Sequence, residues 1–261
     1  MGENYFHVDA FTGEGLLGNP AGVCLLSQPL SSTRMQQIAN ELSLPETSFV
    51  WPEQGKYGIR WFTPNREVDL CGHATLATAH VLLNVLQPMQ LQQCHFLSAS
   101  GELLVTRDQA DAQRLQLDFP ARPAERISEP AQLSALLGAK VLEVWQAKAM
   151  MVVLATEAEV RQLQPDIRHL IAQFGCGVIV TAPGEQVDFV SRYFSLDGSE
   201  DPVTGSAHCT LLPYWAERLG RNTLHAKQLS ARGGELFCQL LRDRVLLGGY
   251  AQLFLRGTLA L

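Results

Sequence analysis

The hydrophobic and polar positions of the chain change period several times, and each change marks an expected helix or strand. Met35, Ile38 and Leu42 recur at helical spacing in a polar segment that has Ser31 or Ser32 as its N-cap. Short apolar runs on either side of this segment have the length of strands. The expected order in the first half is AGVCLL (strand), SSTRMQQIANEL (helix), TSFVW and YGIRWF (strands), TPNREVD (turn) and CGHATLATAHVLLNVL (helix).

The second half repeats this order with a different sequence. A strand, helical turns interrupted near Pro165, two strands, a turn and an apolar helix follow one another again. We therefore predict two similar lobes with a cleft between them, an N-terminal lobe of residues 1–118 and a C-terminal lobe of residues 119–249, divided near Pro120. We expect the last strand, within residues 250–261, to cross back and complete the first lobe.

Each copy ends in a glycine that opens an apolar helix. Gly72 of CGHAT and Gly205 of TGSAH occupy matching positions, and each follows an acidic, turn-rich loop. The N-terminus of a helix carries backbone N–H groups without helical partners and about half a positive charge, and glycine lets a ligand approach that backbone closely. We expect Gly72 and Gly205 to line a site for a small carboxylate substrate or an enolate-like intermediate.

The side chains near these glycines differ between the two copies. They are Cys71 and His73 in the first copy, and Thr204, Asp201 and Ser206 in the second. The first copy also has a carboxylate, Glu46, in the loop before its apolar strand, whereas the second copy reads FGCGVIV at that place. A carboxylate in one lobe alone predicts a single general base rather than a symmetric pair.

Composition excludes several classes of protein. The net charge is −6, and lysines and arginines do not cluster, so we expect no nucleic-acid partner. The chain has neither an apolar run long enough for a membrane helix nor a basic, apolar leader, so we expect no membrane association and no secretory signal. Six scattered cysteines are typical of reduced thiols in a cytoplasmic protein. The spacings Cys71-x-His73 and His208-Cys209 match no common zinc pattern, so we expect no metal.

Longer stretches, spread in order from about residue 7 to residue 240, resemble a known family. They are VDAFTGEGLLGNPAGV, IANELSLPETSFV, IRWFTPNREVDLCGHATLATAHVL, SASGELLV, LDFPARP, RYFSLDGSEDPVTGSAHCTLLPYW and ARGGELFCQLL. Together they resemble the phenazine biosynthesis-like (PhzF-like) isomerases, which share the diaminopimelate epimerase fold. The resemblance implies an α+β protein of two lobes, each a central helix wrapped by a highly curved mixed β-sheet. It also implies an enzyme that needs no cofactor or metal, and a possible homodimer.

The resemblance assigns roles to the candidate residues. It makes the glutamate of PETSF, Glu46, the acid/base, and it gives His73, Asp201 and Ser206 supporting roles around the substrate. The best-known reaction of the family is an allylic isomerisation, in which the glutamate takes a proton from one carbon and returns it at another. We therefore expect an isomerase that acts on a small, cyclic amino-acid-like or carboxylated substrate. The residues expected to bind this substrate are Gly72, Gly205, Cys71, Thr204 and Asn19.

Several alternatives stay open at this point. Related amino-acid epimerases use two thiols, and the second of these positions falls on Thr204, whose hydroxyl has no accessible pKa as a proton carrier, so a two-thiol racemase is disfavoured. An epimerase or racemase of another kind, or a binding module that uses the same scaffold, remains an alternative. Asp201 and Ser206 could serve as turn and capping residues, and Asn19 could form a turn rather than reach the cleft.

Overall fold

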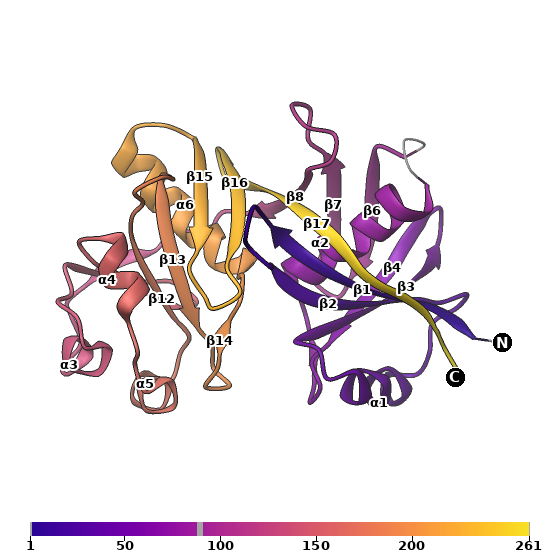
Figure 1. Ribbon diagram of the computed structural model, residues 1–261, viewed down its shortest axis with the longest axis horizontal. Helices are drawn as coiled ribbons and strands as arrows, with labels where there is room; N and C mark the ends of the chain where they lie inside the picture. The colour runs from indigo at the N-terminus through magenta and orange to yellow at the C-terminus, as the bar shows by residue number, and fades with distance from the viewer. Residues whose placement is uncertain (1, 88–90, 261) are drawn as a thin grey trace. The chain divides into compact units, whose positions relative to one another are not determined.

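The chain folds into two units, seen in Figure 1 in a computed structural model that describes residues 2–87 and 91–260. Unit 1 contains the chain up to Asp118 and the segment from Gly248 onward, and unit 2 runs from Phe119 to Leu247. Two strands, β8 (Leu115–Pro120) and β17 (Arg244–Leu259), continue from one unit into the other. The last predicted position of the C-terminal strand, residue 261, lies outside the described residues.

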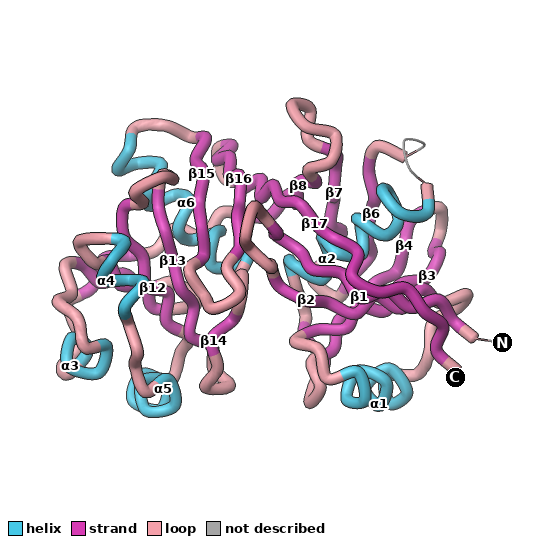
Figure 2. The backbone as a smooth tube through the Cα atoms, in the orientation of Figure 1, coloured by secondary structure: helices cyan, strands magenta, loops and turns pink. Residues whose placement is uncertain are grey.

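Unit 1 is a mixed sheet that closes on itself around a helix. The pairings are antiparallel for β17–β1, β1–β2, β3–β4, β4–β5, β6–β7 and β7–β8, and parallel for β2–β3 and β4–β6. A pairing of β8 with β17 completes the closure (Figure 2). Its other elements are β1 (Glu3–Thr12), β2 (Asn19–Leu25), α1 (Ser32–Leu42), β3 (Glu46–Glu53), β4 (Lys56–Phe62), β5 (Glu67–Val68), α2 (Gly72–His80), η1 (Val81–Leu86), β6 (Gln93–Ser98) and β7 (Gly101–Arg107).

The two main helices of unit 1 serve different purposes. Helix α1 is amphipathic, its N-cap Ser31 accepts the N–H of Arg34, and its buried Met35 and Ile38 pack with Phe49 of β3. Helix α2 is buried along nearly its whole length and packs against β1, β2 and β3. The sequence predicted one continuous helix here, but a π-helical turn, η1, replaces the α-helix from Val81 onward.

Unit 2 is also a mixed sheet, and its helices differ in number from those of unit 1. The pairings are antiparallel for β9–β10, β10–β11, β12–β13, β13–β14 and β15–β16, and parallel for β11–β12 and β13–β15. Its elements are β9 (Glu125–Ile127), α3 (Leu133–Leu137), β10 (Glu143–Gln146), β11 (Met150–Val153), α4 (Glu157–Gln162), α5 (Ile167–Phe174), β12 (Val178–Pro183), β13 (Phe189–Phe194), β14 (Glu200–Asp201), α6 (Gly205–Leu219), β15 (Thr223–Gln228) and β16 (Gly234–Leu241).

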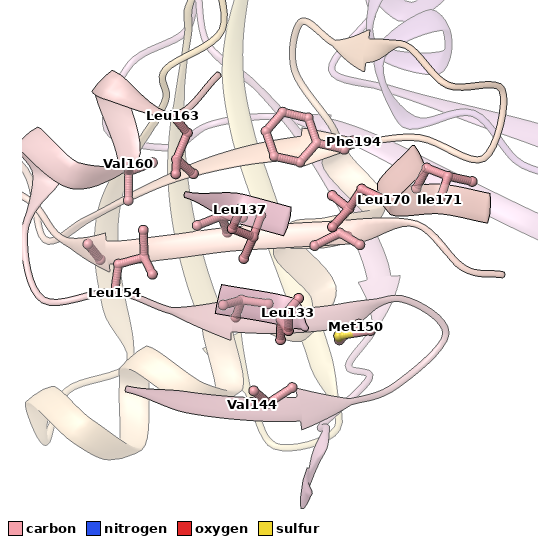
Figure 3. Packing of buried hydrophobic residues seen from close by; sticks show 14 of the residues in the cluster. Leu133, Leu137, Val144, Met150, Leu154, Val160, Leu163, Leu170, Ile171 and Phe194 are labelled. Atoms are coloured by element: carbon pink, nitrogen blue, oxygen red, sulfur yellow. The ribbon is translucent and has the colours of Figure 1, made fainter. Parts of the chain in front are cut away.

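The core of unit 2 lies between its sheet and three short helices. Figure 3 shows side chains from α3, α4 and α5 meeting those of β10, β11 and β13. The predicted interruption near Pro165 is present, because α4 ends at Gln162 and Asp166 caps α5 by accepting the N–H of His169. Helix α6 is buried like α2 and continues through Pro213.

The helices also bear on a membrane location. Within residues 2–87 and 91–260, no helix combines the length and the apolar character that a membrane crossing needs.

Candidate active site

Glu46 is held at the start of a strand rather than in a loop. The sequence pattern placed it before the strand. Parallel pairing with β2 extends β3 to include Glu46, whose register partner is Ala21. Two residues further on, the Ser48 and Thr78 hydroxyls lie 2.7 Å apart and tie β3 to helix α2. The Ser48 hydroxyl also donates to the Gly22 carbonyl at 3.1 Å. These bonds fix the Glu46 backbone relative to α2.

His73 lies against Glu46 because it is the second residue of α2. Its Nε2 is 3.3 Å from Oε2 of Glu46, with the His73 side chain 6% exposed and the Glu46 side chain 21% exposed. The chain enters α2 through Cys71, which has the extended backbone of an N-cap residue. The carbonyl of Cys71 accepts both the hydroxyl of Thr75 at 2.5 Å and its N–H at 3.2 Å, which fixes the first turn. The Glu46 carboxylate is therefore partly exposed on one side and contacts a buried imidazole on the other.

The imidazole of His73 is uncharged at neutral pH. Burial lowers its pKa to about 4, against a smaller opposing effect of the Pro20 backbone. Its second nitrogen, Nδ1, is 3.2 Å from Nδ2 of Asn19 and 3.5 Å from Sγ of Cys71. The structure thus brings Glu46, His73, Cys71, Gly72 and Asn19 together in unit 1, as the sequence analysis expected of residues that share one site.

The same side chains raise the question of a metal. Glu46, Cys71 and His73 each offer a ligand-type atom, and these atoms lie within 4.8 Å of one another. One ion would need converging lone pairs at about 2.0–2.3 Å. The thiol, however, faces Nδ1 of His73 and the carboxylate faces Nε2, and the lone pairs of these two nitrogens point apart. The ligand-type atoms therefore do not direct converging lone pairs at one point, as a single bound ion would need.

The second predicted loop forms its own network in unit 2. Thr204 is the N-cap of α6, and its hydroxyl donates to Oδ2 of Asp201 at 2.5 Å. Fully buried Gln228 accepts the Thr204 N–H at 2.8 Å and donates to the Asp201 carbonyl at 2.7 Å. Ser206 is exposed on the first turn of α6, beside Gly205. Sequence reasoning missed Gln228, because a lone glutamine at the end of a strand has no distinguishing pattern.

A side chain at the position in unit 2 that matches Glu46 would displace the end of the Tyr193 side chain. Val178 pairs with Phe194 as Thr47 pairs with Phe62, so the residue before Val178, Gly177, corresponds to Glu46. A Cβ atom at Gly177 would lie 2.3 Å from the hydroxyl oxygen of Tyr193. The expected asymmetry is therefore present at this pair of positions, with a carboxylate in unit 1 and a glycine in unit 2.

Each acidic loop is anchored by an arginine that the sequence analysis did not single out. Arg60 binds both carboxylate oxygens of Glu67 at 2.6 Å, and Arg192 binds those of Glu200 at 2.7 and 2.9 Å. The signal was present in the sequence, since an arginine two residues before a phenylalanine precedes an acidic residue of the turn in both halves. These bidentate pairs fix the loops that lead to α2 and α6.

Comparisons with known proteins agree with this architecture. The family described as phenazine biosynthesis-like protein, PhzC-PhzF, matches residues 8–257. An uncharacterized isomerase of Pseudomonas aeruginosa is 46% identical, with 98% of each chain covered. A crystal structure from the phenazine biosynthesis protein PhzF family of Enterococcus faecalis has a TM-score of 0.94 at 45% identity, with all of both chains covered.

A more distant neighbour bears on the fold alone. A hydroxyproline epimerase from Agrobacterium vitis has a TM-score of 0.64 at 12% identity, covering 100% of this chain and 93% of the other. The architecture is therefore shared with epimerases. The family match over nearly the whole length, together with relatives of such high identity, shows that this chain belongs to the PhzF-like family of phenazine biosynthesis-like proteins.

Proposed function

We propose that the protein is an isomerase that moves a carbon-bound proton by general acid/base catalysis, with Glu46 as the base. The observation that carries the proposal is the contact between a partly exposed carboxylate and a buried, uncharged imidazole in unit 1. A general base needs a free face toward its substrate and a fixed orientation. Glu46 has both, because its strand is tied to α2 and His73 packs against one carboxylate oxygen.

The neutral state of His73 matters for this role. A charged imidazolium beside Glu46 would stabilise the carboxylate strongly and weaken it as a base. A neutral imidazole packed 3.3 Å from the carboxylate leaves the negative charge of Glu46 available for a proton. The proposed reaction needs no redox group, since a proton is taken from one carbon and returned at another.

The substrate class follows from the start of α2. The side chain of the N-cap residue, Cys71, makes no capping hydrogen bond to α2, and the first turn of α2 contains no acidic residue. Its N–H groups and partial positive charge favour a carboxylate or a developing enolate near Gly72. We propose a small carboxylated, amino-acid-like substrate, with Cys71 and Gly72 among its contacts.

The second loop is proposed to contribute through Asp201 and Ser206, with Gly205 and Thr204 as further substrate contacts. Two features of the described residues support this role. Ser206 is exposed in the first turn of α6, and the side chain of the N-cap residue, Thr204, makes no capping hydrogen bond to the helix that Gly205 opens. The similar strand pairings of the two units support an internal duplication in which one copy kept the base. A homodimer and a cytoplasmic location stay predictions from the sequence.

Solvent-deuterium exchange tests the reaction type. Wild-type protein would be incubated in deuterium oxide with cyclic dienes, amino acids and hydroxy acids, including the dihydro-hydroxyanthranilate type, and followed by proton NMR. Double-bond migration with deuterium at the new carbon supports the isomerase. Deuterium at the α carbon with loss of chirality identifies an epimerase instead, and small anions that bind without any exchange indicate a binding module.

A further inference from the structure

A tyrosine of unit 2 takes the place that the proposed base takes in unit 1. Strands β12 and β13 pair as β3 and β4 do, so Gly177 corresponds to Glu46. A Cβ atom at Gly177 would overlap the hydroxyl oxygen of Tyr193. The Tyr193 hydroxyl therefore occupies the space in which a side chain like that of Glu46 would begin.

The strand pairing explains how a tyrosine reaches this place. Tyr193 is the register partner of Ile179, and Gly177, Ile179 and Thr181 lie on one face of β12 because side chains alternate along a strand. That face is covered by helix α6, since the Thr181 hydroxyl oxygen accepts the indole N–H of Trp215 at 3.0 Å. The Tyr193 side chain thus lies between the sheet of unit 2 and α6.

The Tyr193 hydroxyl lies toward the N-terminal end of α6. In unit 1 the Glu46 side chain contacts the second residue of α2, and the second residue of α6 is Ser206. Tyr193 is also the register partner of Asp201, whose carboxylate accepts the hydroxyl of the N-cap residue of α6. Tyr193 therefore belongs to the same end of unit 2 as the residues proposed above to contact the substrate.

The Tyr193 hydroxyl has a proton to donate. Within residues 2–87 and 91–260, no hydrogen bond of this hydroxyl is found. The side chain is half-buried, whereas Trp61, at the matching position of unit 1, is 1% exposed. Burial raises the pKa of the Tyr193 phenol, and the negative charge of Asp201 adds to the effect. The phenol therefore keeps its proton at neutral pH and can donate it to an acceptor.

We propose that Tyr193 is a substrate-binding residue of unit 2, whose hydroxyl donates a hydrogen bond to an anionic oxygen of the substrate. The class of ligand, a small carboxylate, rests on the proposed function. A second carboxylate at this place would repel an anionic substrate, whereas a phenol donates to it. Unit 1 then presents a group that takes a proton, and unit 2 presents a hydrogen-bond donor at the corresponding place.

Carbon NMR of protein with ¹³Cζ-labelled tyrosine tests the contact without turnover, because this carbon carries the phenol oxygen. The chain has five tyrosines, and Tyr193→Phe and Tyr214→Phe assign the two signals to be compared. The probes are benzoate and L-proline, with sodium chloride at equal ionic strength as the blank. The Tyr193 signal should move along a saturable curve with at least one probe. The signal of Tyr214, whose hydroxyl donates to Glu143 at 3.3 Å, should not move. A Tyr193 signal that neither probe moves overturns the proposal.

The Tyr193→Phe variant measures what the hydroxyl contributes to affinity. Urea unfolding of this variant should match wild type, since the hydroxyl has no acceptor among the described residues. Its affinity for the probe that moves the Tyr193 signal should fall by about 10- to 100-fold, the usual effect of losing a hydrogen bond to a charged group. The matched control, Tyr214→Phe, should bind the probe as wild type does. Wild-type affinity in Tyr193→Phe, or an equal loss in Tyr214→Phe, overturns the proposal.

Kinetics separate this role from the proposed reaction. With a substrate found by deuterium exchange, Tyr193→Phe should raise KM by about 10- to 100-fold and leave kcat within about threefold, as for an interaction made equally in the ground and transition states. A fall in kcat at unchanged KM contradicts the binding role. Probe binding at Tyr193 together with a fully active Glu46→Gln variant contradicts the proposed function and leaves the role of Tyr193 standing.

Discussion

Acid should destabilise the fold over a pH range that is determined by buried histidines rather than by carboxylates. Burial lowers the pKa of His73, His80 and His208 from 6.5 to about 4, with Arg107 adding to the effect at His80. Between pH 6.5 and 4, these histidines therefore bind protons in the unfolded chain but not in the folded protein. A depressed folded-state pKa gives stability that is fully present above 6.5 and is lost as the pH falls toward 4.

The size of the loss follows from proton linkage. Each such histidine lowers the free energy of unfolding by about 1.4 kcal/mol per pH unit within the window. Together these histidines should cost about 3 to 4 kcal/mol between pH 6 and pH 5, a large part of the roughly 5–15 kcal/mol that stabilises an ordinary domain. Urea unfolding followed by tryptophan fluorescence at half-unit pH steps measures this slope.

Two variants identify the source of the slope. His208→Asn keeps a donor for the Thr204 carbonyl but removes the titrating ring, so the slope should fall by about one third. His169→Gln, a change at an exposed histidine of α5, should leave the slope unchanged. A free energy of unfolding that stays flat between pH 6.5 and 5, or an unaltered slope in His208→Asn, would refute the reasoning.

Two further predictions concern unit 2. Gly177→Ala should destabilise the protein by about 1–3 kcal/mol in urea unfolding, because its Cβ would overlap the Tyr193 hydroxyl. Adding Tyr193→Phe should recover part of this loss. No loss of stability in the single variant would contradict the assigned clash. Gln228→Leu removes the hydrogen bonds of Gln228 to the Thr204 N–H and the Asp201 carbonyl, so the free energy of unfolding should fall by about 2–4 kcal/mol. A thermal unfolding midpoint within about 1 °C of wild type, on the order of measurement error, would show that the network is dispensable.

Much of the fold was predictable because it rests on local patterns. The helical spacing of Met35 and Ile38 with a serine before it was enough to place α1 and its cap, since both are short-range effects. The interruption near Pro165 followed from the same kind of signal. The start of β3 was misplaced because Glu46 joins the strand only through parallel pairing with β2, which a local pattern does not contain.

The candidate residues could be selected from the sequence, whereas their contacts could not. Glu46, Cys71 and His73 were found through motifs, and the structure brings them together. Asn19 was expected to bind substrate, and the fold buries its amide nitrogen 3.2 Å from Nδ1 of His73. Such contacts depend on how strands and helices pack, and no spacing along the chain shows on which side of an imidazole a neighbour will lie.

The central claim is that Glu46 moves the proton. The most direct measurement compares deuterium incorporation by wild type, Glu46→Gln and Glu235→Gln under identical conditions, with circular dichroism to verify folding. Glu235 is the matched control because it is a glutamate of unit 2 that pairs with a histidine, His225, at 2.8 Å. The account predicts a loss of about 10²- to 10⁴-fold or more in Glu46→Gln and wild-type exchange in Glu235→Gln. Equal exchange rates in all the proteins would contradict it.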